Sequence, residues 1–167
     1  MIIAGTGHRP YKLGGFAKSG WDLLVEFATL QLQRLRPNEV ISGMALGWDQ
    51  ALATAAIKIN TPLIAAVPCE GHESRWDEES QRYYHTLLGK ARKVVVVSPG
   101  AYVAKMMMVR NKWMVDALQS EDLLLALWDG SAGGTARTIV YAESRTIRVE
   151  NVWDQWREYV CAREKNQ

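Results

Sequence analysis

The chain has 167 residues, of which 48% are hydrophobic, and a formal charge of +2. This size and composition suit one folded domain and exclude a disordered chain. Its 20 basic and 18 acidic residues nearly balance, which disfavours binding of nucleic acid by bulk charge. Two distant cysteines indicate neither a disulfide framework nor a metal site. Without a signal pattern or a membrane-length apolar run, we expect a cytoplasmic protein with no membrane contact.

Apolar runs alternate with amphipathic stretches along the chain. In chain order they predict a strand over 1–4, a helix over 21–35, a strand over 39–42, a helix over 49–59, a strand over 61–67, a helix over 73–91, a strand over 94–97, a helix over 102–118, a strand over 122–128, a helix over 135–144, a strand over 146–149 and a helix over about 152–164. The four consecutive valines at 94–97 are typical of a strand covered on both faces.

Such alternation predicts one Rossmann-like α/β domain over residues 1–167, with a mostly parallel sheet and helices on both faces. The last helix is expected to pack on this domain or on a partner subunit.

Glycine-rich segments follow several of the expected strands, at 5–9, 42–49, 68–71 and 129–135. In an open parallel sheet these turns lie at the carboxyl edge of the strands, where ligands bind. Glycine permits positive φ and close approach of backbone amides. The helix that follows adds unpaired N–H groups and the positive end of its dipole. We therefore predict an anion site for a phosphate-bearing ligand.

Neither common phosphate fingerprint is present. Gly5-Thr6-Gly7 is followed by His8-Arg9-Pro10, so G-x-G-x-x-G fails, and no G-x-x-x-x-G-K-[ST] segment occurs. The sequence therefore disfavours an ordinary NAD dehydrogenase or a P-loop NTPase.

The predicted ligand-binding residues come from these turns and from the helix expected over 102–118. They are Gly5, Thr6, Gly7, His8, Arg9, Ser42, Gly43, Gly47, Asp49, Glu70, Arg110, Asn111, Asp129, Gly130, Gly133, Gly134 and Thr135.

Three basic side chains have competing interpretations. Arg110 offers a planar fork to a phosphate or ribose, or else forms a salt bridge on a helix surface. Arg9 is expected to contact an anion or a base edge. His8 is equally suited to such a contact and to a structural hydrogen bond.

Acidic and aromatic residues near the turns leave similar alternatives. Asp49 caps a helix or accepts from a ribose hydroxyl. Glu70 and Asp129 accept hydrogen bonds from a ribose or from an amine of the base, or else they are solvated loop carboxylates. Trp48 and Trp76 stack on a base or pack in the interior.

Five segments carry a family resemblance over roughly residues 1–145. They are GTGHRP at 5–10, SGMALGWDQ at 42–50, AAVPCEGHE at 65–73, MVRNKWMVD at 108–116 and LWDGSAGGT at 127–135. Together they resemble the SLOG superfamily, and within it the YspA/YpsA-like proteins, which are related to the DprA and LOG families. The resemblance implies a Rossmann-like sheet and a nucleotide-type ligand, with no cofactor required. The resemblance also implies a homo-oligomer, either a dimer or a tetramer. The many Trp and Met side chains, some of which we expect to be exposed, favour the same state.

The resemblance also shows a departure from the LOG pattern. LOG enzymes cleave the N-glycosidic bond of a nucleoside monophosphate, and their signature has the form M-x-x-R-K followed by P-G-G-x-G-T-x-x-E. Met107 to Asn111 matches the first part and keeps the Arg, but the position of the catalytic Glu falls on Thr138. Glycosidic cleavage usually needs carboxylates. The catalytic residues are therefore unknown, with Arg110 and Glu70 as candidates and Glu73 as a further substitute carboxylate.

Three functions follow from this comparison. The leading hypothesis is a protein that binds a nucleotide-derived signal, ADP-ribose-like or a cyclic nucleotide, as a sensor or sequestering protein, and the resemblance extends it to phage–host conflict. The alternative is a LOG-like phosphoribohydrolase. The second alternative is a DprA-like DNA-processing helper, which the near-neutral charge disfavours.

Overall fold

The computed structural model describes residues 1–15 and 17–164, and within these ranges the chain forms one domain with a six-stranded parallel sheet. The strands are β1 (Ile2–Gly7), β2 (Glu39–Ser42), β3 (Leu63–Val67), β4 (Lys93–Val96), β5 (Leu123–Leu127) and β6 (Arg148–Asn151). They lie in the order β4-β3-β2-β1-β5-β6. The predicted Rossmann-like fold is confirmed.

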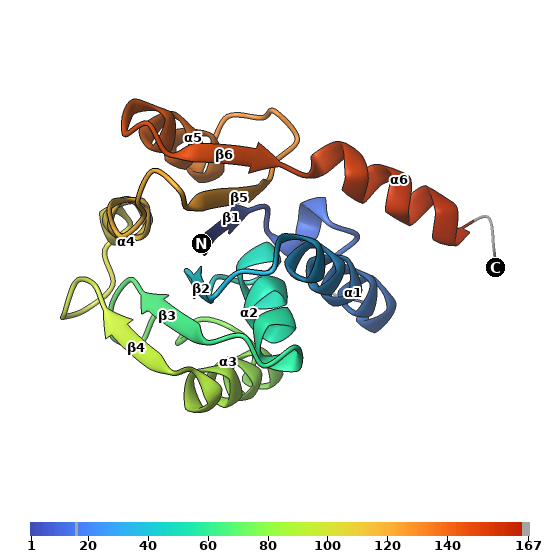
Figure 1. Ribbon diagram of the computed structural model, residues 1–167. Helices are drawn as coiled ribbons and strands as arrows, with labels where there is room; N and C mark the ends of the chain where they lie inside the picture. The colour runs from blue at the N-terminus through green and yellow to red at the C-terminus, as the bar shows by residue number, and fades with distance from the viewer. Residues whose placement is uncertain (16, 165–167) are drawn as a thin grey trace.

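Helices cover both faces of this sheet. They are α1 (Lys18–Leu35), α2 (Trp48–Lys58), α3 (Glu78–Lys90), α4 (Lys105–Asp116), α5 (Gly134–Ser144) and α6 (Trp153–Glu164), with a short 3-10 turn η1 (Pro10–Lys12) after β1. One core cluster joins α1, α2, α3 and α6 to the sheet, and a second joins α4 and α5 to the opposite face. In Figure 1, α4 lies on one side of the strands, and α1 and α2 lie on the other.

Strand β5 shows why the sheet needs two helical layers. Leu123, Leu125 and Leu127 belong to one core cluster, and Leu124 and Ala126 belong to the other. Successive side chains of a strand point to opposite faces. A strand that is apolar at every position must therefore be buried on both sides, as parallel sheets require.

The strand order reverses beside β1. From β1 the chain builds outward through β2, β3 and β4, and then crosses back so that β5 pairs with β1 on its other edge. The carboxyl ends of these two strands meet, with Gly7 opposite Leu127. This is a topological switch point, the usual ligand position in open α/β sheets.

The prediction of a fully covered valine strand at 94–97 is wrong. Strand β4 is the outer strand of the sheet, and Val94 and Val96 are 44% and 38% exposed. Helix α4 contacts β1 and β3 rather than lying over β4. The apolar run therefore reflects an edge strand with one open face.

Two helices begin later than their sequence pattern predicts. Helix α3 begins at Glu78 because Asp77 caps it, accepting a hydrogen bond from the Ser80 amide at 2.9 Å. Tight turns from Gly71 to Trp76 precede this cap. Helix α4 begins at Lys105.

The expectation of exposed Trp and Met side chains is also wrong. Over residues 1–15 and 17–164, every Trp and Met is buried or half-buried. Trp156 of α6 packs against Phe27 of α1, with ring centroids 5.3 Å apart, so this chain's own domain receives the last helix. Within the same residues, no helix is long and apolar enough to cross a bilayer.

Candidate functional site

A cavity of about 260 Å³ lies at the switch point. The predicted residues that line it are Thr6, Gly7, His8, Arg9, Asp49, Arg110, Asn111, Gly133, Gly134 and Thr135. The sequence reasoning missed Tyr11, Lys12, Ala45, Met107, Ser131 and Ala132. Ala45, Ser131 and Ala132 lie within the predicted turns, and Tyr11 and Lys12 lie in η1 directly after the first turn. Met107 lies one helical turn from Arg110, so closeness in the sequence was the signal that could have found all six.

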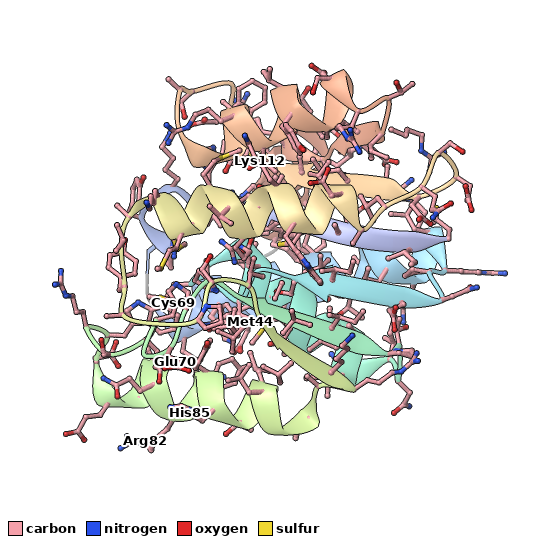
Figure 2. The ribbon with its side chains drawn as sticks, turned by 90° about the vertical axis from the view of Figure 1, so that its left-hand side faces the viewer. Met44, Cys69, Glu70, Arg82, His85 and Lys112 are labelled. Carbon is pink, nitrogen blue, oxygen red and sulfur yellow. The ribbon has the colours of Figure 1, made fainter. Side chains whose placement is uncertain are left out.

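Other predicted residues lie outside this lining. They are Gly5, Ser42, Gly43, Gly47, Glu70, Asp129 and Gly130. Glu70 is exposed beside Cys69 at the carboxyl end of β3, as Figure 2 shows. The Ser42 hydroxyl is buried, donating to the Asp49 carbonyl at 2.7 Å and accepting from the Met44 amide at 3.1 Å.

A buried ion pair connects two sides of the cavity. The Arg110 guanidinium on α4 lies 3.6 Å from the Asp49 carboxylate at the start of α2, with side-chain exposures of 3% and 8%. Arg110 also donates to the Gly43 carbonyl. Burial lowers the pKa of Arg110 and raises that of Asp49, and the attraction between the two charges opposes both shifts. Arg110 is therefore not part of a salt bridge on a helix surface, and the N-cap position of α2 is held by Gly47 rather than Asp49.

Two glycines near this pair serve the packing of the site. A Cβ on Gly43 would overlap the Arg110 guanidinium and approach the Asp49 carboxylate. Gly47 has φ +96°, and a Cβ there would meet the His8 carbonyl. Both glycines hold the turn after β2 close to the turn after β1.

Within β1, Gly5 and Gly7 have a similar role. A Cβ on Gly5 would strike Leu52, and one on Gly7 would strike the Trp48 ring. Trp48 is completely buried, so the alternative in which it stacks on a ligand base is wrong. The glycines are strand residues that make room for α2.

A hydrogen-bonded chain links α4 to the start of α5. Arg110 Nε donates to Asn111 Oδ1 at 2.8 Å, and Asn111 Nδ2 donates to Thr138 Oγ1 at 2.8 Å. Thr138 Oγ1 donates to the Gly134 carbonyl, also at 2.8 Å. The residue at the LOG glutamate position is thus 2% exposed and fully engaged in positioning the glycine turn.

Helix α5 begins at the cavity wall. Gly133, Gly134 and Thr135 all line the cavity, and α5 has no side-chain cap. The first-turn amides of a helix have no partner within the helix and favour an anion. Gly130, with φ +89°, forms the turn that leads into this segment.

Asp129, at an exposed position, organises the turn after β5 through its hydrogen bonds. Its carboxylate lies 2.8 Å from Lys12 Nζ. Hydrogen bonds from Lys12 and Ser131 hold the pKa of Asp129 far below its usual value. His8 Nε2 lies 2.9 Å from the Asp129 amide nitrogen and 2.7 Å from Oδ1. Burial is the largest influence on His8 and lowers its pKa, which favours a neutral imidazole that accepts the amide hydrogen.

Arg9 differs from the other cations of the cavity. Lys12 and Arg110 each face a carboxylate, whereas Arg9 forms no ion pair with any residue in 1–15 or 17–164. It is half-buried and lines the cavity. Its charge is therefore available to an anionic ligand.

A second cavity of about 200 Å³ adjoins the first and shares Arg9 and Met107 with it. Its remaining lining residues are Gly71, His72, Ser74, Arg75, Trp76 and Tyr102. Trp76 is half-buried there. Among the described residues, no group of three or more His, Cys, Asp or Glu side chains is placed to hold a metal ion.

The parallel sheet, its two helical layers and the polar cavity at the switch point define a Rossmann-like α/β protein. The YspA SLOG family model matches residues 3–152, and the chain belongs to that family.

The chain is also similar to several named proteins. The chain is 27% identical over 129 residues to the uncharacterized SPbeta prophage-derived protein YoqJ of Bacillus subtilis, covering 68% of this chain and 73% of YoqJ. It is 25% identical over 162 residues to a UPF0398 protein of Bacillus thuringiensis, covering 90% of this chain and 86% of the relative. Among solved structures, the DNA processing protein A of Streptococcus pneumoniae aligns with TM-score 0.42 and 14% identity, over 96% of this chain and 60% of that protein.

Proposed function

We propose that this protein binds a nucleotide or nucleotide-derived signal, ADP-ribose-like or a cyclic nucleotide, in the cavity at the switch point, and acts as a sensor or sequestering protein. One observation carries the proposal. The first residues of α5, which has no side-chain cap, line the same cavity as more cationic than acidic side chains. Its site residues are those that line the cavity, and no cofactor is required.

The charges of the cavity suit a phosphate. Arg9, Lys12 and Arg110 line it, whereas Asp49 is the carboxylate among the lining residues. Asp129 neutralises Lys12 in part from outside the lining. Arg9 is left to bind the ligand, and its guanidinium forms charge-assisted hydrogen bonds to phosphate oxygens.

Isothermal titration calorimetry with ADP-ribose, NAD and cyclic nucleotides tests the proposal. Arg9→Ala is expected to weaken binding by roughly tenfold or more, because a hydrogen bond to a charged group contributes about 1.5–3 kcal/mol. Arg82→Ala is the matched control, since Arg82 extends outward from α3 (Figure 2), lines neither cavity and forms an ion pair only with Glu78 among the described residues. Absence of binding to every nucleotide at millimolar concentration contradicts the proposal.

The same samples separate binding from catalysis. LOG-type hydrolysis predicts release of free base from a nucleoside monophosphate, whereas we expect intact ligand, because Thr138 supplies no carboxylate and its hydroxyl is committed to Asn111 and Gly134. A DNA-processing role predicts a salt-dependent mobility shift of single-stranded DNA, which the near-neutral charge disfavours.

The cellular part of the proposal is a cytoplasmic role in phage–host conflict. Its support is the family resemblance and a relative whose name describes it as prophage-derived. Phage plating efficiency on cells with and without the gene, and with an Arg9→Ala copy, measures this role. Equal plating on all three strains would count against it.

We also propose that the chain forms a homo-oligomer, a dimer or a tetramer. Family habit is the remaining support, because the Trp and Met side chains are not exposed. Light scattering coupled to size exclusion gives the mass directly, and a value near the 18.8 kDa of one chain contradicts this part.

A further inference from the structure

We propose that the second cavity binds the planar base of the same ligand, so that the ligand is a nucleoside diphosphate derivative that extends from one cavity into the other. This inference rests on the proposed function. Each cavity, at about 260 and 200 Å³, is smaller than the roughly 300–1,000 Å³ of typical small-molecule sites. Arg9 and Met107 line both, so the two cavities adjoin at these side chains.

Aromatic side chains form much of the second cavity. The Trp76 ring is held by edge contacts to His72 at 5.0 Å and to Tyr84 at 5.3 Å between centroids. Tyr102, 46% exposed, approaches from the segment between β4 and α4. An indole ring held beside an open space, together with the Tyr102 ring at the same cavity, suits a flat heterocycle, since every base has a π-face on which such rings stack.

His72 contributes a polar atom that has no hydrogen-bond partner. Its side chain is 8% exposed, and Nδ1 is buried with no hydrogen-bond partner among the described residues. Burial lowers the pKa of His72 to about 3, so the imidazole is neutral at physiological pH. A buried nitrogen without a partner is uncommon in folded proteins. Because His72 lines the second cavity, we assign a nitrogen of the bound base to this atom as its hydrogen-bond partner.

The charges around the junction indicate the middle of the ligand. Arg75 lines the second cavity, Arg9 lies where the two cavities adjoin, and no carboxylate is among the residues that line the second cavity. Neither arginine forms an ion pair with another residue in the described ranges. Two guanidinium groups without an ion pair, at and beyond the junction, suit a diphosphate that connects the nucleoside to a second sugar.

Calorimetric titration of the whole chain with ribose 5-phosphate and with ADP-ribose tests the inference. We expect ADP-ribose to bind at least about tenfold more tightly, in line with the contribution of one stacked base. Tyr102→Ala should weaken ADP-ribose binding about tenfold through lost stacking. His72→Phe keeps an aromatic ring beside Trp76 but removes the hydrogen bond to the base, and should also weaken binding up to about tenfold. Both variants should leave ribose 5-phosphate binding within about twofold of the parent, and Arg82→Ala should change neither titration.

The outcomes separate this inference from the function on which it rests. If ribose 5-phosphate and ADP-ribose bind equally, or if His72→Phe and Tyr102→Ala weaken both ligands alike, the base subsite is refuted and the phosphate site stands. If neither ligand, NAD nor any cyclic nucleotide binds, both proposals are overturned. Tyr102 is half-exposed on a surface segment, so Tyr102→Ala remains informative even where a change at the buried His72 impairs folding.

Discussion

Arg110 and Asp49 face each other at 3.6 Å in the interior, and the pair ties α4 to the start of α2. Removing one partner of a buried ion pair leaves an uncompensated charge. Arg110→Met is therefore expected to lower the free energy of unfolding by about 3–5 kcal/mol. Urea denaturation followed by tryptophan fluorescence measures this loss.

The double variant of Arg110→Met with Asp49→Asn provides the control. It should lose less stability than the sum of the two single variants, because the orphaned carboxylate is gone. Additive losses would show that the two charges do not stabilise each other.

A side chain at Gly43 is expected to destabilise the protein, because a Cβ there overlaps the Arg110 guanidinium. Gly43→Ala should lower the unfolding free energy by about 1–3 kcal/mol through overpacking. Gly89→Ala on α3 is the matched control, since its Cβ meets nothing within 4 Å. That variant should be neutral or should stabilise by about 0.5–1 kcal/mol, because alanine loses less backbone entropy in a helix. Thermal melts of both variants decide the comparison, and equal effects would contradict it.

Thr138→Val, compared with a control threonine, should measure how much the hydrogen bond to Asn111 stabilises the protein. The Thr138 hydroxyl bonds both the Gly134 carbonyl and Asn111, so valine leaves the half-buried Asn111 amide without this partner, at a cost of about 1–3 kcal/mol. Thr86→Val is the control, because Thr86 makes the same bond to the carbonyl four residues earlier but is exposed. Chemical denaturation of both variants measures the difference, and similar losses would mean that the Asn111 bond contributes nothing.

The stability of the protein should fall as the pH drops below about 6.5. Burial lowers the folded-state pKa of His72 from 6.5 to about 3, and it lowers that of His8 as well. Between these values the unfolded chain binds a proton that the folded chain does not, so acid favours unfolding. Each such group contributes a slope of up to about 1.4 kcal/mol per pH unit. His72→Phe should therefore flatten the dependence between pH 6.5 and pH 4, which unfolding curves at several pH values will show.

Local sequence was sufficient for the element order, because hydrophobic periodicity and turn-forming glycines are short-range properties. The runs at 61–67 and 122–128 predicted β3 and β5, which are buried strands of the parallel sheet. The same reasoning predicted that the turns of Arg9 and Thr135 lie at one edge, since parallel strands end at the same side, whereas Arg110 was identified through the family resemblance.

The sequence could not predict which residues contact each other across the fold. Arg110 could be assigned to a ligand or to a surface bridge, and only the structure showed its buried contact with Asp49, 61 positions earlier in a different layer. The same holds for Val94 and Val96, whose apolar run gave no sign of the open face of β4.

The chain's own pattern thus determined a Rossmann-like sheet with glycine turns at its carboxyl edge. The tertiary structure alone decided which glycines line the cavity, and it showed that Gly5, outside the lining, and Gly7, within it, make room for helix α2. It also decided that His72 and Trp76 lie beside Arg9. The physical reason is that periodicity reports whether a side chain is buried, whereas its neighbours depend on how distant segments cross in space.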